Sequence, residues 1–99
     1  YVSAMIRSWR NSATPKVWEG GQPNQFRGLD FDAALDLLAA LNVAKAPQDL
    51  SPLKSVGLHR LSGNRKGQWA MTVNARWRIC FQFAEGHAHN VEIVDYHRG

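Results

Sequence analysis

The chain has 99 residues, of which 44% are hydrophobic and 20% charged, with a net charge of +4 and one cysteine. A chain of this length buries roughly two-thirds of its unfolded surface, which suits one domain and is too little for two. No apolar run approaches the roughly 20 residues of a membrane span, and one cysteine cannot form an intrachain disulfide, so we expect a cytoplasmic protein without a membrane helix.

The first half of the chain predicts a short strand followed by two helices. Apolar and polar residues alternate from Met5 to Trp9, as in a half-buried strand. Thr14-Pro15 opens a brief helix that reaches Glu19, before two glycines. Asp30 can cap a second helix, whose apolar positions share one face: Phe31, Ala34, Leu35, Leu38 and Leu41.

The second half predicts an antiparallel meander of four strands, separated by turn residues. The expected strands are Val56–Leu61, Gln68–Val73, Trp77–Phe83 and His89–Tyr96. The fold class is therefore α+β: an N-terminal strand, two helices, and a β-meander packed on the helices. We expect one domain over residues 5–97, with residues 1–4 and 98–99 as extras beyond a native start at Met5.

Alternation along the third strand of the meander predicts an open face on the sheet. If Trp77, Ile79 and Phe81 pack on the helices, then Arg78 and Cys80 point the other way. The small side chains of Ala70 and Thr72 in the preceding strand would then leave a shallow groove edged by Arg78. A guanidinium there can bind a phosphate through two parallel hydrogen bonds. An equal alternative is that Arg78 is an exposed arginine that keeps a strand edge soluble.

Groups suited to proton transfer lie on the first strand of the meander and at the end of the last. His59 is on the former, and Asp95, Tyr96 and His97 follow each other on the latter. Two histidines, an aspartate, a tyrosine and arginines could cleave RNA without metal, because a base can deprotonate the ribose 2′-hydroxyl while an acid protonates the 5′-oxygen. Each residue taken singly is as well explained by a structural role.

Basic residues are concentrated between positions 60 and 78, a stretch that contains no acidic residue: Arg60, Arg65, Lys66, Arg76 and Arg78. A local cationic surface suits a polyanion such as RNA. The alternative is a solvated strand face of an ordinary basic protein.

His87 and His89 form an H-x-H pair that could bind a metal only with a third ligand. Neither a cysteine pair nor a spaced acidic ligand accompanies them, so we expect no metal site and no cofactor.

Four stretches of the chain resemble the HigB toxins, a family within the RelE/ParE superfamily. The ordered set of motifs L-H-x-L-x-G-x-R-x-G-x-W, W-R and D-Y-H carries this resemblance and is much more specific than any one of the motifs. The stretches are Met5–Trp9, Leu58–Trp69, Val73–Phe83 and Val91–His97.

The resemblance implies the toxin half of a bacterial type II toxin–antitoxin pair. Such toxins are mRNA interferases, metal-free endoribonucleases that cut mRNA in the ribosomal A site and so inhibit translation. They are neutralised by a helix-turn-helix antitoxin of the HigA type, and they meet operator DNA only through the antitoxin complex. The alternative is a non-catalytic toxin-like binding protein, or a ParE-like gyrase poison.

The resemblance also implies roles for particular residues. His59 and His97 are the acid–base candidates, Asp95 and Tyr96 orient or assist them, and Arg78 holds the scissile phosphate. The basic stretch, and not the resemblance, supplies the further candidates for binding RNA phosphates: Arg60, Arg65, Lys66 and Arg76. Many relatives have lysine and aspartate where this chain has Ser62 and Asn64, so one phosphate contact of the family is missing here.

Overall fold

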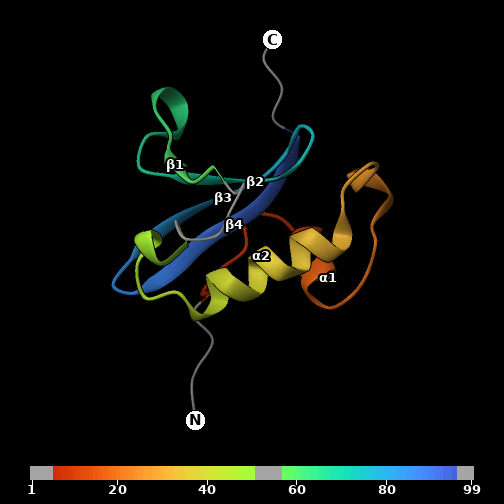
Figure 1. The fold of residues 1–99 in the computed structure, drawn as a ribbon, viewed down its shortest axis with the longest axis horizontal. Coiled ribbons are helices and arrows are strands. Elements are labelled where there is room, and N and C mark those ends of the chain that lie inside the picture. The colour runs from red at the N-terminus through yellow and green to blue at the C-terminus, as the bar shows by residue number, and fades with distance from the viewer. Residues whose placement is uncertain (1–5, 51–56, 96–99) are drawn as a thin grey trace.

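The computed structural model describes residues 6–50 and 57–95 (Figure 1). Two helices precede a four-stranded sheet, and short 3₁₀ turns lie at residues 24–26, 47–50 and 63–65. The elements are α1 (Thr14–Trp18), α2 (Phe31–Val43), β1 (His59–Arg60), β2 (Trp69–Asn74), β3 (Trp77–Ala84) and β4 (His87–Asp95). Neither helix in the described part of the chain has the length and apolar character needed to cross a membrane.

The sheet is the predicted antiparallel meander, in the order β1-β2-β3-β4. β1 is shorter than predicted: it pairs with β2 only at His59 and Arg60, because Gly57 has a φ of +57°, outside the extended region. The predicted residues Val56 and Tyr96 lie outside the described residues.

The N-terminal segment, residues 6–10, runs parallel to β4 along the free edge of that strand. Bridges join Ile6 to Ala88 and Trp9 to Val91. Two backbone hydrogen bonds between Ser8, Arg10 and Val91 hold it there, at 3.1 and 3.0 Å. The predicted opening strand is therefore present as a short edge segment, although Met5 itself is not described.

Both helices lie on one face of the sheet (Figure 1), and α2 begins where the sequence predicts. The Asp30 carboxylate accepts a hydrogen bond from the Ala33 amide at 3.0 Å, which satisfies one of the unpaired donors of the first turn. Leu38 and Leu41 are fully buried on the face that meets the sheet, as the spacing predicts. In α1, the Thr14 hydroxyl accepts from the Ile93 amide at 3.0 Å and so ties α1 to β4.

The two faces of the sheet differ as alternation predicts, with one correction. Ile79, Phe81 and Met71 are completely buried against the helices. On the helix-free face, however, Ala70 is only 1% exposed and Cys80 is 0% exposed. The predicted groove floored by Ala70 and Thr72 is therefore wrong at Ala70, because the segment between β1 and β2 folds over this part of the face, whereas Thr72 is partly exposed.

Burial of Cys80 affects the reactivity of its thiol, which can be tested. Desolvation raises the pKa of its thiol, with Glu92 adding to this effect, while Arg65 and Arg78 partly oppose it. Since the thiolate is the nucleophile, we expect the native protein to resist iodoacetamide at pH 8 and the urea-unfolded protein to take up one adduct by mass spectrometry.

The sign of the pH effect on stability follows from the raised pKa. A group that binds its proton more tightly when folded stabilises the fold below its unfolded pKa, about 8.5 for a thiol, and this contribution is lost as the pH rises further. Rapid alkylation of the native protein at pH 8 would contradict the buried position of Cys80.

Candidate active site

His59 projects from β1, the edge strand of the meander, and its ring is oriented by the backbone. Its Nδ1 lies 2.7 Å from the carbonyl oxygen of Gly57. Because a carbonyl only accepts, Nδ1 must carry the proton, and in the neutral ring this leaves the lone pair on Nε2. The exposed side chain of His59 can therefore accept a proton through Nε2.

Gly57 is placed against β2, where a side chain would be crowded. A Cβ at this position would lie 3.3 Å from Oγ1 of Thr72, and the positive φ already disfavours any residue with a Cβ. The carbonyl that orients His59 thus belongs to a residue whose backbone conformation favours glycine.

Gly57→Ala should therefore impair both stability and activity. We expect a loss of about 1 to 2 kcal/mol in the free energy of unfolding, measured with urea, from the left-handed conformation alone. RNA cleavage should fall roughly tenfold or more, because the carbonyl partner of His59 shifts. Gly20→Ala is the matched control, since Gly20 also has a positive φ but no atom lies within 4 Å of its Cβ position. Equal activities of the two variants would contradict the orienting role of Gly57.

Arg78 and His59 lie on the same, helix-free face of the sheet. Directly paired residues share a face of the sheet, and His59 pairs with Ala70, which pairs with Cys80. Arg78 precedes Cys80 by two residues on the same strand, so it also lies on this face. Two strand spacings, about 10 Å, and two residues along the strand, about 7 Å, separate the two Cα atoms. Arg78 is not among the residues that line the cleft beside His59, so the two residues share a face of the sheet without lining one cleft.

Backbone contacts hold the Arg78 guanidinium at the β2–β3 turn. Its Nη1 donates to the carbonyl of Ala75 at 2.8 Å and to that of Trp77 at 3.2 Å. The turn is itself anchored, because the Asn74 side chain accepts from the Asp30 amide at 2.9 Å and donates to the Gly28 carbonyl at 3.0 Å. Arg78 is therefore preorganised by the same loop that starts α2.

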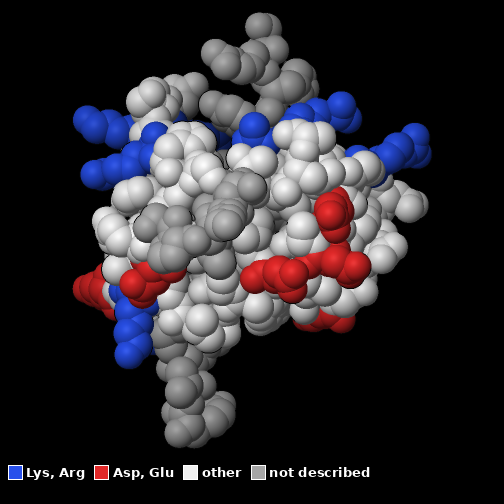
Figure 2. All heavy atoms as spheres, viewed as in Figure 1, with Lys and Arg blue, Asp and Glu red and all other residues white. Residues whose placement is uncertain are grey.

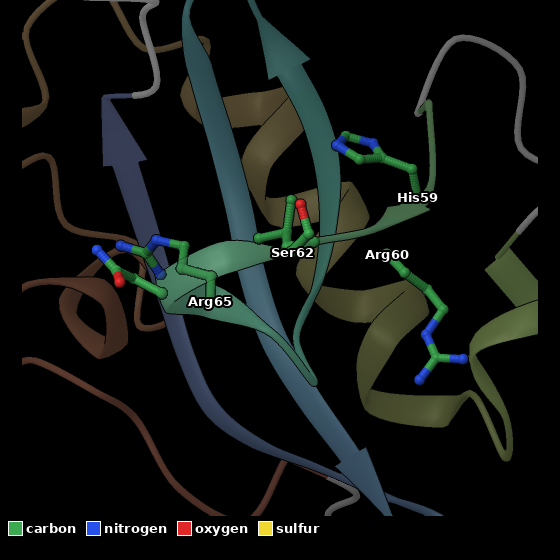
Figure 3. Close-up of a pocket in the computed structure, with 6 residues that line it drawn as sticks. His59, Arg60, Ser62 and Arg65 are labelled. Atoms are coloured by element: carbon green, nitrogen blue, oxygen red, sulfur yellow. The ribbon is translucent and has the colours of Figure 1, made fainter.

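A cleft of about 360 Å³ lies beside His59 (Figure 3). It is lined by six residues of β1 and the following loop: His59, Arg60, Leu61, Ser62, Asn64 and Arg65. Its polar lining could accommodate a sugar-phosphate group. Within it, His59 and the head group of Arg60 point in opposite directions (Figure 3).

Arg60 reaches the other face of the sheet. Its guanidinium carbon lies 5.3 Å from the centroid of the Trp69 ring, with which it is also paired in register. This cation–π contact places the charge on the face that carries the helices, away from His59. Arg60 thus lines the cleft together with Arg65, but its guanidinium is directed away from His59.

Two other residues among the predicted RNA-binding cations form ion pairs within the protein. Arg65 lies 2.9 Å from Glu92, and Arg76 lies 2.9 Å from Asp95. Lys66 is exposed on the β1–β2 loop and takes part in no ion pair found among the described residues. Asp95 ends β4, and Tyr96 and His97 fall outside the described residues, so their roles stay predictions.

Charge is unevenly distributed over the surface. In Figure 2, Lys and Arg gather along the upper edge, where Figure 1 places the β1–β2 loop and the β2–β3 turn, and acidic residues lie lower, over α2. Exposed Lys66 and Arg76 belong to this loop and turn, and exposed Asp32 and Asp36 belong to α2. The positive end of the molecule is thus the end that carries His59 and Arg78.

The H-x-H pair has a contact that competes with metal binding. Nη2 of Arg7 donates to Nε2 of His87 at 3.1 Å, so this lone pair is already used. Among the residues that the structure describes, no group of three or more His, Cys, Asp or Glu side chains is placed to hold a metal ion.

Two residues of the site were missed by the sequence analysis: Gly57 and Glu92. The only sequence signal for Glu92 is a single acid between apolar neighbours, Val91 and Ile93, in a strand. Gly57 precedes a strand, as many turn glycines do, and nothing local distinguishes it.

Comparison with known proteins identifies similar sequences. Residues 22–97 match the family described as RelE-like toxin of type II toxin–antitoxin system HigB. The chain is also 36% identical over 93 residues to a protein of Proteus vulgaris named Endoribonuclease HigB, a match that covers 94% of this chain and 100% of that protein.

Proposed function

Because the chain belongs to the HigB-like family of RelE-like toxins of type II toxin–antitoxin systems, we propose that it is an endoribonuclease that cleaves mRNA on the ribosome. The activity rests on the name of its Proteus vulgaris relative and on the acid–base groups of the site. The single observation that carries it is the position of His59, with Nε2 available as a base, on the same sheet face as Arg78.

The reaction we propose is a metal-independent transesterification. Nε2 of His59 takes the proton of the ribose 2′-hydroxyl, and the 2′-oxygen forms a bond to phosphorus while the bond from phosphorus to the 5′-oxygen breaks. Arg78 stabilises the negative charge that grows on the phosphoryl oxygens. His97 donates the proton that the leaving 5′-oxygen needs, assisted by Asp95 and Tyr96. The products are a 2′,3′-cyclic phosphate and a 5′-hydroxyl end.

The charge of the protein supports the dependence on the ribosome. A net charge of +4 is small, and Arg65 and Arg76 in the basic stretch are held by carboxylates of the protein, so the attraction to RNA phosphates is modest. Affinity for free RNA depends on the number of such contacts and falls steeply with salt. The ribosome would then supply the positioning that the toxin lacks.

The partner that type II membership implies is an antitoxin. We propose that it is a helix-turn-helix protein of the HigA type, that operator DNA is bound only through the complex of the two, and that the toxin acts in the cytoplasm.

The decisive experiment maps mRNA ends in a purified translation reaction with ribosomes paused at a known codon. We expect new 5′-hydroxyl ends within the A-site codon, and little cutting of the same mRNA without ribosomes. Equal cutting of naked RNA would overturn the ribosome dependence. Absence of any cutting would overturn the nuclease assignment, and DNA breaks in a parallel gyrase assay would then support the gyrase-poison alternative.

A further inference from the structure

Glu92 is a nearly buried acid on the helix-free face of the sheet, and the proposed chemistry does not use it. Its side chain is 9% exposed, and Oε2 lies 2.9 Å from Nη1 of Arg65 and 3.4 Å from Nε of Arg10. A carboxylate removed from water must be paired or it loses its charge, and the two arginines provide this pairing. Arg65 also donates to the Gln68 side chain at 3.0 Å.

The contact between Arg65 and Glu92 crosses the sheet. His59, Ala70, Cys80 and Glu92 are aligned in one row across β1, β2, β3 and β4. Arg65 belongs to the loop between β1 and β2, whereas Glu92 is on β4, about 14 Å from β1 at the usual strand spacing. To meet Glu92, the loop must fold over β2 and β3, which explains the complete burial of Cys80.

The same loop forms one wall of the cleft beside His59 (Figure 3). Ser62, Asn64 and Arg65 line the cleft together with His59. A hydrogen bond from the Leu61 amide to the Gln68 carbonyl, at 2.9 Å, closes the loop at its base. The loop makes only a single 3₁₀ turn of its own, at residues 63–65. Its position over the sheet is therefore fixed by the side chain of Arg65 rather than by regular backbone structure.

We propose that Glu92 is a positioning residue for RNA cleavage, which holds Arg65 and thereby keeps the β1–β2 loop in place as the wall of the cleft beside His59. This inference rests on the proposed function. It also reassigns Arg65, whose guanidinium serves the protein rather than the RNA phosphate. Arg10 adds a second cation, so the N-terminal segment is tied to the same carboxylate.

Glu92→Gln tests the proposal, since it keeps the shape of the side chain and removes its charge. We expect amide hydrogen exchange across residues 61–68 to become at least tenfold faster. The kcat for cleavage on the ribosome should fall roughly 10- to 100-fold, as for a catalytic group that loses its alignment, with KM changed less than twofold. Glu19→Gln is the matched control, because Glu19 is exposed and the change in net charge is the same.

Arg65→Gln is the second variant, for the case that Glu92→Gln does not fold. It leaves Glu92 paired with Arg10, so we expect this variant to keep the fold. It should reproduce the faster exchange and the lower kcat, and the double variant should be no worse than either single one, because both break one interaction. Arg65→Lys should restore part of the kcat.

Three results would overturn the proposal. The first is unchanged exchange and kcat in Glu92→Gln. The second is a raised KM with normal kcat in Arg65→Gln, as expected of a direct phosphate ligand. The third is additive losses in the double variant. An inactive wild-type protein would overturn the proposed function by itself, while the exchange measurement would still decide whether Glu92 holds the loop.

Discussion

His59→Asn should fold like the wild-type protein and cleave mRNA roughly 10²- to 10⁴-fold more slowly, the range for loss of a general base. The asparagine amide nitrogen occupies nearly the position of Nδ1, so it can still donate to the Gly57 carbonyl that orients His59 at 2.7 Å. It offers no basic nitrogen in place of Nε2. The variant therefore separates proton transfer from ring orientation, which His59→Ala would remove together.

Single-turnover cleavage on paused ribosomes is the appropriate measurement, because it reports the chemical step without product release. His89→Asn is the matched control: His89 is also a strand histidine, paired with Gln82 on β3, and lies outside the proposed cleft. Cleavage by His59→Asn within threefold of the wild-type rate would exclude His59 as the base.

Arg78→Ala should have the second large effect, a loss of roughly 10²- to 10³-fold in kcat, as when one preorganised donor to a developing oxyanion is removed. The guanidinium is held at the turn by the carbonyls of Ala75 and Trp77, at 2.8 and 3.2 Å, so it costs little to reorganise during the reaction. Arg78→Lys should be intermediate, because a lysine keeps the charge but cannot present two parallel donors to a phosphate.

The control for net charge is Arg27→Ala, since Arg27 is exposed and only its backbone carbonyl is used, by the Trp77 indole at 3.2 Å. Binding of each variant to ribosomes should be measured alongside cleavage. If Arg78→Ala lost ribosome binding in proportion to its lost cleavage, Arg78 would be a docking residue and not a ligand of the scissile phosphate.

Much of the fold could be predicted because it follows from local patterns. The cap at Asp30, the buried face of α2 at Leu38 and Leu41, and the alternation of Ile79 and Phe81 each depend on neighbours within a few residues. The length of β1 could not be predicted, because it is limited by the backbone of Gly57 and by its approach to Thr72 on another strand.

The site was harder to predict because its contacts join residues that are far apart in the sequence. Alternation placed Arg78 on the helix-free face, but it gave no partner for Arg65, whose contact with Glu92 spans 27 residues. A basic stretch in the sequence therefore indicated more RNA-binding cations than the folded protein offers. The side of the sheet on which Arg60 lies depends on the register of a two-residue strand, which no periodicity defines.

The parallel pairing of the N-terminal segment with β4 has a consequence for folding during synthesis. The Ser8 hydroxyl accepts a hydrogen bond from the Asn90 amide, 82 residues later in the chain, at 2.8 Å, so this segment leaves the ribosome well before the strand with which it pairs. Contacts between such distant residues form late and slowly. Neither this sheet edge nor the contact of Arg10 with Glu92 can form until β4 has left the ribosome, so the fold of the toxin is completed only after the last strand of the sheet has emerged.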